Sequence, residues 1–215
     1  MIRAIIFDLD NCLSAADEVG ERLLEPVFDA IRRNNHSRLS EETLEKVFFD
    51  CWRHPLDWVA KRHGFSPQML AAAWTAYSGL EVSVPMRGYP DLDTLSELPV
   101  QRFLVTSGFR RMQESKVRAL GFARLFTTIC IDAIDENDRK GKEKIFAEIL
   151  RNYRLCPEEV LVVGDNPDSE IEAGNRLGIT TVQILRPGVP RGNNATHTIK
   201  GLVELKGLVS SIPRA

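Results

Sequence analysis

Five short runs of hydrophobic residues, rich in β-branched side chains, predict buried strands. They are Ile2–Phe7, Arg102–Val105, Phe126–Ile131, Val160–Val163 and Thr180–Ile184. Continuous apolar runs of this length are typical of strands covered on both faces. Between them lie the helical patterns Arg110–Leu120, Lys142–Tyr153 and Pro167–Leu177. The alternation of strand and helix predicts an α/β fold, a Rossmann-like parallel sheet with helices on both faces.

The connection between the first two strands, residues 14–88, is too long for a loop. It contains four helical patterns, at Glu18–Asn34, Glu41–Cys51, Pro55–His63 and Pro67–Ser78. Pro26 marks a kink or a restart in the first of them, because proline interrupts the helical hydrogen bonds. We therefore expect an α/β core of residues 1–13 and 89–215, with an all-helical cap, residues 14–88, inserted after the first strand.

Composition and charge restrict the classes of function. The chain has 215 residues, 43% of them hydrophobic, and its 28 basic and 30 acidic residues give a formal net charge of −2. This balance is typical of a folded globular protein and argues against a dedicated nucleic-acid or membrane-surface binder. No apolar run approaches the ~18 residues of a membrane helix, and we expect no signal peptide. The four scattered cysteines form no CxxC pair, so we expect a cytoplasmic protein without a zinc site.

Polar side chains follow the first two predicted strands. Asp8 and Asp10 come directly after the first strand and, being two residues apart, face the same side. Thr106, Ser107 and Gly108 end the second strand just before a helix, where hydroxyls and backbone N–H groups hold anions well. Turn aspartates and a helix cap are the structural alternatives. The two patterns gain weight together, because ligands of parallel sheets bind outside the carboxyl ends of the strands.

A third set of acidic residues follows the fourth predicted strand. Asp165 comes directly after it, and Asp168 and Glu170 follow where the helix dipole also favours acidic residues. Carboxylates gathered from two strand ends would repel one another and raise their pKa values. A Mg²⁺ ion resolves that repulsion, because it prefers oxygen ligands and leaves positions open for a phosphate. A lysine is then needed to balance the phosphate charge, and the run Arg139–Lys144 supplies candidates.

In their order along the chain, these motifs resemble those of the haloacid dehalogenase-like hydrolase superfamily. The four matching segments are Asp8-Leu9-Asp10-Asn11-Cys12-Leu13, Thr106 with Ser107-Gly108, Lys140, and Gly164-Asp165 with Glu170. The resemblance covers nearly the whole chain. The helical insertion has the position of the family's cap, and Thr196–Leu205 is similar to the tail that closes the fold.

The resemblance implies a phosphatase that works through an aspartyl-phosphate. Asp8 would attack phosphorus, and Asp10 would protonate the leaving oxygen and later deprotonate the attacking water. On the same resemblance, the phosphoryl group would be held by Thr106, Ser107, Gly108 and Lys140. The metal would be held by the Asp8 and Asp165 carboxylates and the Asp10 carbonyl, with Glu170 as a further acid acting through water.

Two of these assignments have alternatives. Lys140 is followed by Gly141, where close relatives have proline, so Lys142 remains a candidate for the third motif. We favour Lys140, because Ile145-Phe146 then fall at the position of the family's Ile-Phe pair. The second acid of the fourth motif matches Glu170 by spacing, with Asp168 as the alternative.

The family's branches differ at the acid two residues after the nucleophile, which phosphatases have and haloacid dehalogenases lack. Asp10 therefore favours a phosphatase. Cys12, in place of the commoner threonine, is similar to pyrimidine 5′-nucleotidase-like members and indicates a nucleotide, with a buried structural role as the alternative. Candidates for substrate contact are Trp52, His54, Trp58 and Tyr77 of the cap and Arg110 and Arg111, with cap packing and solvent exposure as alternatives.

We therefore expect a phosphomonoesterase of a small phosphorylated metabolite, a nucleotide or a sugar phosphate, that exists as a monomer or weak homodimer. A phosphomutase or a haloacid dehalogenase of the same fold is the alternative among enzymes. A phosphate-binding or regulatory protein without turnover is the alternative outside enzymes, and the intact pair of Asp8 and Asp10 weighs against it.

Overall fold

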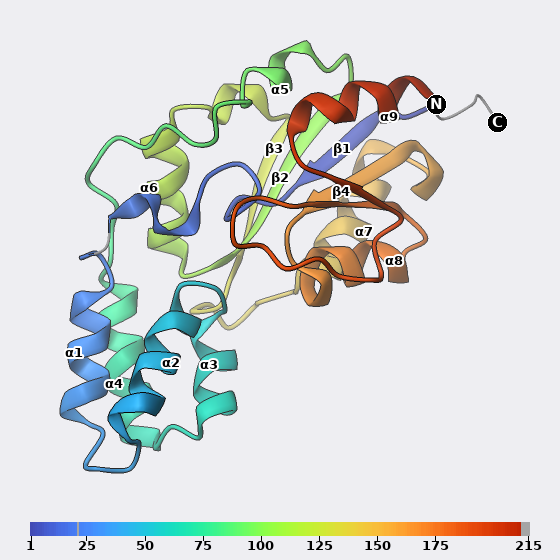
Figure 1. The fold of residues 1–215 in the computed structure, drawn as a ribbon. Coiled ribbons are helices and arrows are strands. Elements are labelled where there is room, and N and C mark those ends of the chain that lie inside the picture. The colour runs from blue at the N-terminus through green and yellow to red at the C-terminus, as the bar shows by residue number, and fades with distance from the viewer. Residues whose placement is uncertain (21, 212–215) are drawn as a thin grey trace.

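A six-stranded parallel sheet forms the centre of the computed structural model, which describes residues 1–20 and 22–211 (Figure 1). The strands are β1 (Ala4–Phe7), β2 (Gln101–Gly108), β3 (Thr128–Ala133), β4 (Val160–Gly164), β5 (Thr180–Ile184) and β6 (His197–Ile199). Their order in the sheet is β3-β2-β1-β4-β5-β6, with every neighbouring pair parallel. This confirms the predicted Rossmann-like fold. The chain adds strands on one side of β1 and then on the other, so the strand order reverses between β1 and β4.

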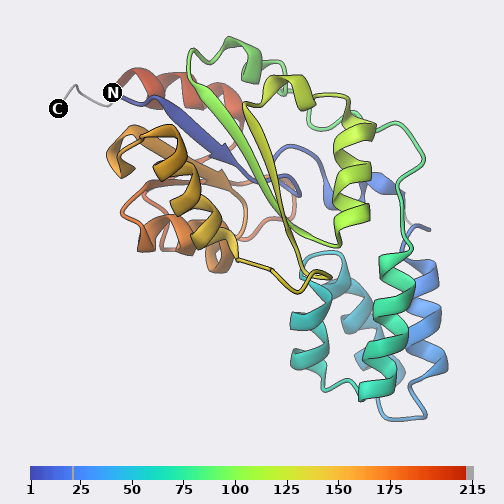
Figure 2. The same ribbon diagram turned by 180° about the vertical axis from the view of Figure 1, so that it is seen from behind.

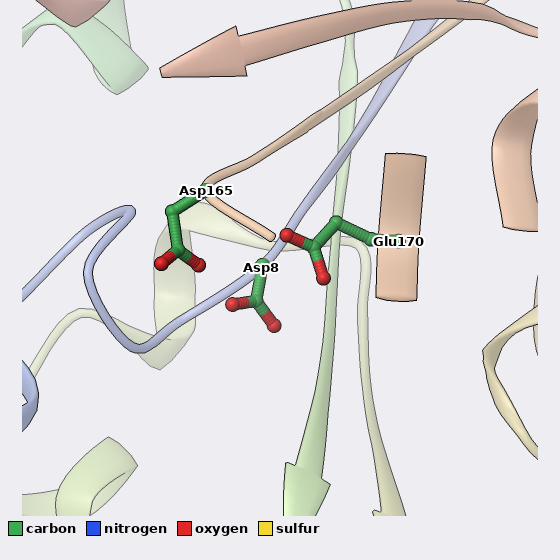
Figure 3. A group of neighbouring side chains, drawn as sticks. All are labelled: Asp8, Asp165 and Glu170. Atoms are coloured by element: carbon green, nitrogen blue, oxygen red, sulfur yellow. The ribbon is translucent and has the colours of Figure 1, made fainter. Parts of the chain in front are cut away.

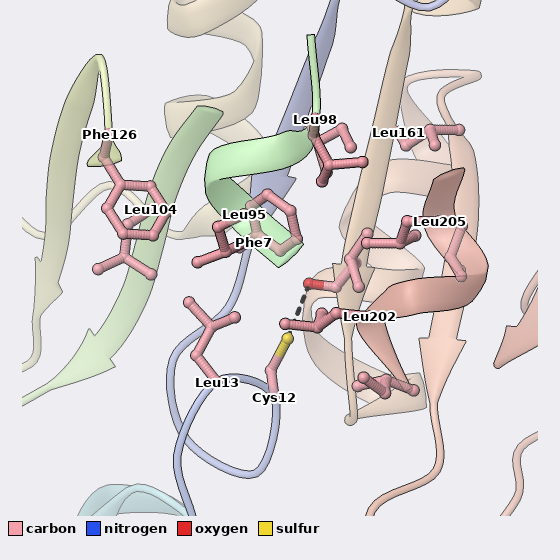
Figure 4. Close-up of a cluster of buried hydrophobic side chains, with 14 of the residues drawn as sticks. Phe7, Cys12, Leu13, Leu95, Leu98, Leu104, Phe126, Leu161, Leu202 and Leu205 are labelled. Atoms are coloured by element: carbon pink, nitrogen blue, oxygen red, sulfur yellow. Dashed lines mark hydrogen bonds between the residues drawn. The ribbon is translucent and has the colours of Figure 1, made fainter. Parts of the chain in front are cut away.

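Helices cover both faces of the sheet (Figures 1 and 2). They are α5 (Thr94–Glu97), α6 (Arg110–Leu120), α7 (Lys142–Tyr153), α8 (Glu172–Arg176) and α9 (Leu205–Ser211). Alternate residues of β1 serve the two faces. Ile5 and Phe7 pack in the hydrophobic cluster that includes side chains of α5, α6 and α9 (Figure 4), whereas Ala4 and Ile6 pack with α7 and α8. Burial on both faces explains why β1 is hydrophobic without alternation.

Four helices lie beyond the carboxyl ends of the strands, in the segment predicted to be helical (Figures 1 and 2). They are α1 (Glu25–Arg33), α2 (Glu41–Cys51), α3 (Leu56–His63) and α4 (Pro67–Ser78). They share a hydrophobic cluster that also includes Phe109, Met112 and Ile134 of the α/β part. Ser40 and Ser66 cap α2 and α4 by accepting hydrogen bonds from backbone N–H groups. The boundaries of the insertion, residues 14–88, stay a prediction.

Two predicted helices are divided in the structure. The pattern Glu18–Asn34 becomes a 3₁₀ turn, Ala16–Val19, followed by α1, in which Pro26 occupies the first turn. Proline is tolerated there because no N–H group is needed, so Pro26 marks a restart. The pattern Pro167–Leu177 becomes a π-helical turn, Pro167–Ile171, followed by α8.

The hydrophobic pattern did not predict the short strand β6, which pairs with β5 at the edge of the sheet. No helix in the described part of the chain has the length and hydrophobicity needed to cross a bilayer.

Candidate active site

Asp8 lies at the carboxyl end of the central strand β1. The register pairs Phe7 with Leu104 of β2 and with Val163 of β4. The backbone N–H of Asp8 donates a hydrogen bond to the Val163 carbonyl at 2.9 Å. Asp8 is therefore buried beside the point where the strand order reverses, the usual position of a ligand site in open α/β sheets. Thr106, near the end of β2, is buried as well, and both residues line a cavity at this edge of the sheet.

Asp165 and Glu170 join Asp8 in a carboxylate cluster (Figure 3). One oxygen from each side chain lies within 4.8 Å of the others. The π-helical turn folds Glu170 back toward β4, where its Oε1 accepts a hydrogen bond from the Asn166 N–H at 2.7 Å. Gly164 provides the space, because a Cβ at this position would lie 2.2 Å from Oε1 of Glu170. The glycine is therefore part of what brings the third carboxylate into the site.

The structure places Lys142, and not the favoured Lys140, beside Asp8. The Lys142 ammonium donates to Asp8 Oδ1 and to Glu170 Oε2, each at 2.7 Å, and its side chain is 8% exposed. Lys140 instead binds Glu148 at 2.8 Å, and its side chain is 49% exposed. The expectation that Lys140 contacts the site is thus corrected in favour of the alternative.

Local backbone geometry explains why Lys142 rather than Lys140, and Glu170 rather than Asp168, lies beside Asp8. Gly141 has a φ of 80° and its N–H donates to Asp132 at 2.9 Å, which turns the chain just before Lys142 begins α7. Asp168 is exposed at the start of the π-helical turn, and its N–H donates to the Asn166 side chain. Glu170 therefore lies in the carboxylate cluster, and Asp168 lies outside it.

Burial and charge oppose each other in this cluster. Burial raises the pKa of Asp8, and the nearby Glu170 adds to the effect, although the Lys142 ammonium lowers it. Burial also raises the pKa of Asp165, with Glu170 and Asp8 as further causes. Burial disfavours the Lys142 ammonium, but the carboxylates of Asp8 and Glu170 outweigh it and raise the lysine's pKa. Three carboxylates thus share one ammonium, and negative charge is in excess.

The donor set fits a hard divalent cation. Among the described residues, no group donates a hydrogen bond to Asp8 Oδ2 or to the Asp165 carboxylate, so these oxygens are available as ligands. Both oxygens of Glu170 already accept hydrogen bonds. That Glu170 acts on the metal through water stays a prediction. The excess of negative charge gives a cation a direct electrostatic reason to bind.

The side chain of Asp10 is held separately, by helix α6. Its Oδ1 accepts a hydrogen bond from the Lys116 ammonium at 2.7 Å, and its Oδ2 accepts one from Gln113 Nε2 at 3.1 Å. Sequence reasoning missed both partners. Their signal was the spacing of three residues, which puts Gln113 and Lys116 on one face of a helix that begins just after the predicted anion cradle.

The predicted anion cradle is only partly open. Thr106 lines the cavity, but the Ser107 hydroxyl donates to Asp132 of β3 at 3.1 Å. At the start of α6, the Arg110 N–H donates to the Asp135 side chain at 2.9 Å. Gly108 has a φ of 155° and lines the cavity with Thr106 and Ser107.

A cavity of about 120 Å³ lies between this sheet edge and helices α2, α3 and α4. Its wall on the helical side includes three of the candidates for substrate contact, Trp52, His54 and Tyr77. Tyr77 stacks on Phe109 with ring centres 4.5 Å apart. Further apolar lining comes from Cys51, Leu56, Met112 and Ile134. The cavity therefore has a polar, charged floor and a wall of apolar and aromatic side chains that also includes Arg53 and His54.

The other predicted substrate contacts lie elsewhere. Trp58 stacks on His54, with ring centres 4.0 Å apart, and is outside the cavity lining. Arg110 pairs with Glu136, and Arg111 pairs with Glu81. Neither arginine contacts the cavity.

Cys12 belongs to the core. Its thiol lies 3.6 Å from the Val163 carbonyl, within the hydrophobic cluster of Figure 4. Burial raises the pKa of the thiol well above its usual range, so the sulfur is an inert packing group. The position of Cys12 therefore agrees with a buried structural role, the alternative to a role in nucleotide recognition.

Comparisons with known proteins agree with this geometry. The family described as haloacid dehalogenase-like hydrolase matches residues 2–178. Glyceraldehyde 3-phosphate phosphatase of Methanopyrus kandleri is 32% identical over 200 residues, which cover 86% of this chain and 85% of that protein. Glyceraldehyde 3-phosphate phosphatase of Methanocaldococcus jannaschii is 26% identical, with 100% of both chains covered. The chain belongs to the haloacid dehalogenase-like hydrolase family.

The class of enzyme follows from these two relatives. Both are phosphatases, and the similarity to this chain covers most of the length of each. The protein is a phosphatase of this family, which confirms the predicted branch. A phosphatase of the same family from Thermococcus onnurineus has a similar fold, with a TM-score of 0.67 and 23% identity over 97% of this chain and 98% of that one.

Proposed function

We propose that this phosphatase is a Mg²⁺-dependent phosphomonoesterase in which Asp8 forms an aspartyl-phosphate. The observation that carries the proposal is the placement of Asp8. It lies on the floor of the cavity, at the end of the central strand, with the Lys142 ammonium 2.7 Å from one of its oxygens. A buried carboxylate held in this way is positioned before substrate arrives, so little reorganisation is needed for attack.

The reaction then proceeds in two displacements. An Asp8 oxygen attacks phosphorus while the bond to the leaving oxygen breaks, and the Asp10 carboxyl gives its proton to that oxygen. Water then attacks the phosphorus of the aspartyl-phosphate while the Asp10 carboxylate takes a proton from the water. The bond between phosphorus and the Asp8 oxygen breaks, so inorganic phosphate leaves and the Asp8 carboxylate is restored. Lys142 and the Thr106 hydroxyl hold the phosphoryl oxygens during both steps. Mg²⁺ on Asp8, Asp165 and the Asp10 carbonyl would supply further positive charge against these oxygens.

The substrate is a short sugar phosphate of triose size. The cavity of about 120 Å³ is small, since pockets for drug-sized ligands span ~300–1,000 Å³. The two relatives described above are glyceraldehyde 3-phosphate phosphatases. Cys12, which resembled a nucleotidase feature, lies in the core and does not line the cavity. These observations favour a triose phosphate over a nucleotide.

The test is phosphate release from glyceraldehyde 3-phosphate and from a nucleoside 5′-monophosphate, with Mg²⁺ or with EDTA. We expect release from the triose phosphate, loss of activity in EDTA, recovery with added Mg²⁺, and a much slower reaction with the nucleotide. Asp8→Asn is expected to abolish release, whereas Asp168→Asn, which changes an exposed acid of the same segment, is expected to retain it. Full activity in EDTA or in Asp8→Asn contradicts the proposal, and a preference for the nucleotide contradicts the substrate class.

A further inference from the structure

Two buried side chains of α6 bind the carboxylate of Asp10. Lys116 is 4% exposed and Gln113 is 5% exposed. Lys116 donates to one oxygen of Asp10 at 2.7 Å, and Gln113 donates to the other at 3.1 Å. Burying an ammonium and an amide costs free energy unless their partners are in place. The arrangement therefore ties the position of Asp10 to α6, a helix of the α/β part.

The orientation of Gln113 is fixed by two acceptors. Its Nε2 donates to Asp10 Oδ2 at 3.1 Å and to the Ser107 carbonyl at 3.2 Å, so a flipped amide would place oxygen against oxygen. Gly108 makes the approach possible, because a Cβ there would lie 2.6 Å from Nε2 of Gln113. Within the described residues, the buried Oε1 of Gln113 has no hydrogen-bond partner. The amide thus loses one hydrogen bond in an arrangement that keeps its donor on Asp10.

We propose that Lys116 and Gln113 are positioning residues for Asp10 in the proposed reaction. Asp10 sits in the loop after β1, and its side chain is 24% exposed on the cavity side. Two donors on its two oxygens set the plane of the carboxyl group and its place beside the leaving oxygen. The Lys116 ammonium also compensates the charge that appears on Asp10 when its proton moves to the leaving group.

This inference rests on the proposed function and makes a finer prediction. In the first displacement, the proton of Asp10 is needed only if the leaving oxygen is too basic to depart as an anion. A sugar phosphate has such a leaving group, whereas 2,4-dinitrophenyl phosphate does not. Misplacing Asp10 should therefore slow phosphoryl transfer from the sugar phosphate far more than transfer from the aryl phosphate.

The experiment measures kcat/KM for both substrates in wild type, Lys116→Met, Gln113→Leu and Asp10→Asn, with folding checked by urea unfolding. We expect each α6 variant to lose roughly 10²-fold with glyceraldehyde 3-phosphate and to change little with the aryl phosphate, following the pattern of Asp10→Asn. Lys116→Arg should restore much of the loss. Lys46→Met, which changes an exposed lysine of α2 that pairs with Glu42, is the matched control and should match wild type with both substrates.

Equal losses with both substrates would overturn the positioning role, because they would indicate substrate binding by Lys116 or a general loss of structure. No loss in either α6 variant would overturn it as well. If Lys116→Met does not fold, Gln113→Leu gives the decision alone. Failure of the proposed function is seen separately, as wild-type activity that is independent of Mg²⁺ or as full activity of Asp8→Asn.

Discussion

A single lysine balances the charge at the floor of the cavity. In residues 1–20 and 22–211, Lys142 is the only ammonium within hydrogen-bonding distance of the carboxylate cluster, where it bridges Asp8 and Glu170. A charge this deeply buried is stabilised only by its partners, and removing one side of such a pair is typically worth ~3–5 kcal/mol. Lys142 therefore serves both the fold and the orientation of Asp8.

Substitution of the two lysines separates their roles. Lys142→Met should lower kcat by roughly 10²–10³-fold, because a charge aimed at the phosphoryl oxygens is lost. It should also lower the free energy of unfolding. Lys140→Met removes a surface pair with Glu148 and should leave both quantities within error of wild type. Steady-state assays and urea unfolding check the two variants. Wild-type activity in Lys142→Met, or inactivity in Lys140→Met, would return the site lysine to residue 140.

The carboxylate cluster also predicts how pH and Mg²⁺ act on stability. The pKa is raised from 3.8 to about 7 for Asp8 and to about 8 for Asp165. Between the ordinary pKa of 3.8 and these raised values, the folded protein without metal binds more protons than the unfolded chain. Its free energy of unfolding therefore falls as the pH rises through this range. Mg²⁺ binds the deprotonated carboxylates, so its stabilising effect should grow over the same range.

We expect the rise in Tm on adding Mg²⁺ to be small at pH 5.5 and several degrees at pH 8. Thermal unfolding with Mg²⁺ or with EDTA measures it at both values. Asp165→Asn, which lacks one of the titrating ligands, should lose most of the rise at pH 8. A rise that is the same at both pH values would show that protons and metal do not compete for these carboxylates.

At the scale of elements, the site depends on how β4 ends. Gly164 is the last residue of the strand, and the π-helical turn after it returns Glu170 to the cluster. Each backbone hydrogen bond of a π-helical turn spans five residues, one more than in an α-helix, so the π-helical turn is wider. The wide turn therefore sets where the acid five residues after Asp165 comes to lie.

Gly164→Ala tests this arrangement. The added Cβ meets the side chain of Glu170, so we expect a loss of ~1–3 kcal/mol in the free energy of unfolding and a drop in kcat from the displaced partner of Lys142. Gly207→Ala is the control, because nothing lies within 4 Å of a Cβ in that part of α9. Urea unfolding and steady-state assays compare the two. An unchanged kcat in Gly164→Ala would mean that the position of Glu170 does not matter for the reaction.

The local pattern of hydrophobic and polar residues predicts most of the helices and strands, but only part of the candidate site. The strand ends at Asp8 and Asp165 could be predicted, because buried hydrophobic runs stop at them and parallel strands share an edge. The choice between Lys140 and Lys142 could not, because it depends on the backbone turn at Gly141. The contact of Lys116 with Asp10 joins segments 106 residues apart. The spacing of Gln113 and Lys116 places both on one helix face but does not indicate which acidic residue they bind.

At the scale of the molecule, the small formal net charge of −2 conceals a strongly negative floor of the cavity. Two hydrophobic clusters, one on each face of the sheet, hold the strand ends that carry these charges. A third cluster holds the helices α1–α4 over them and includes Phe109, Met112 and Ile134 of the α/β part. The helices are thus packed against the core at the cavity, where they close the space above Asp8.

The central claim is that Asp8 carries the phosphoryl group during turnover. Its most direct test is mass spectrometry of the protein after reaction with a reactive phosphoryl donor and reduction of the acyl phosphate with borohydride. Asp10→Asn is the protein of choice, because it should accept the phosphoryl group and release it slowly. The account predicts homoserine, the reduction product of aspartyl-phosphate, at position 8 and nowhere else, and none in Asp8→Asn. Modification at another residue, or none at all while Mg²⁺-dependent hydrolysis proceeds in the wild type, would contradict it.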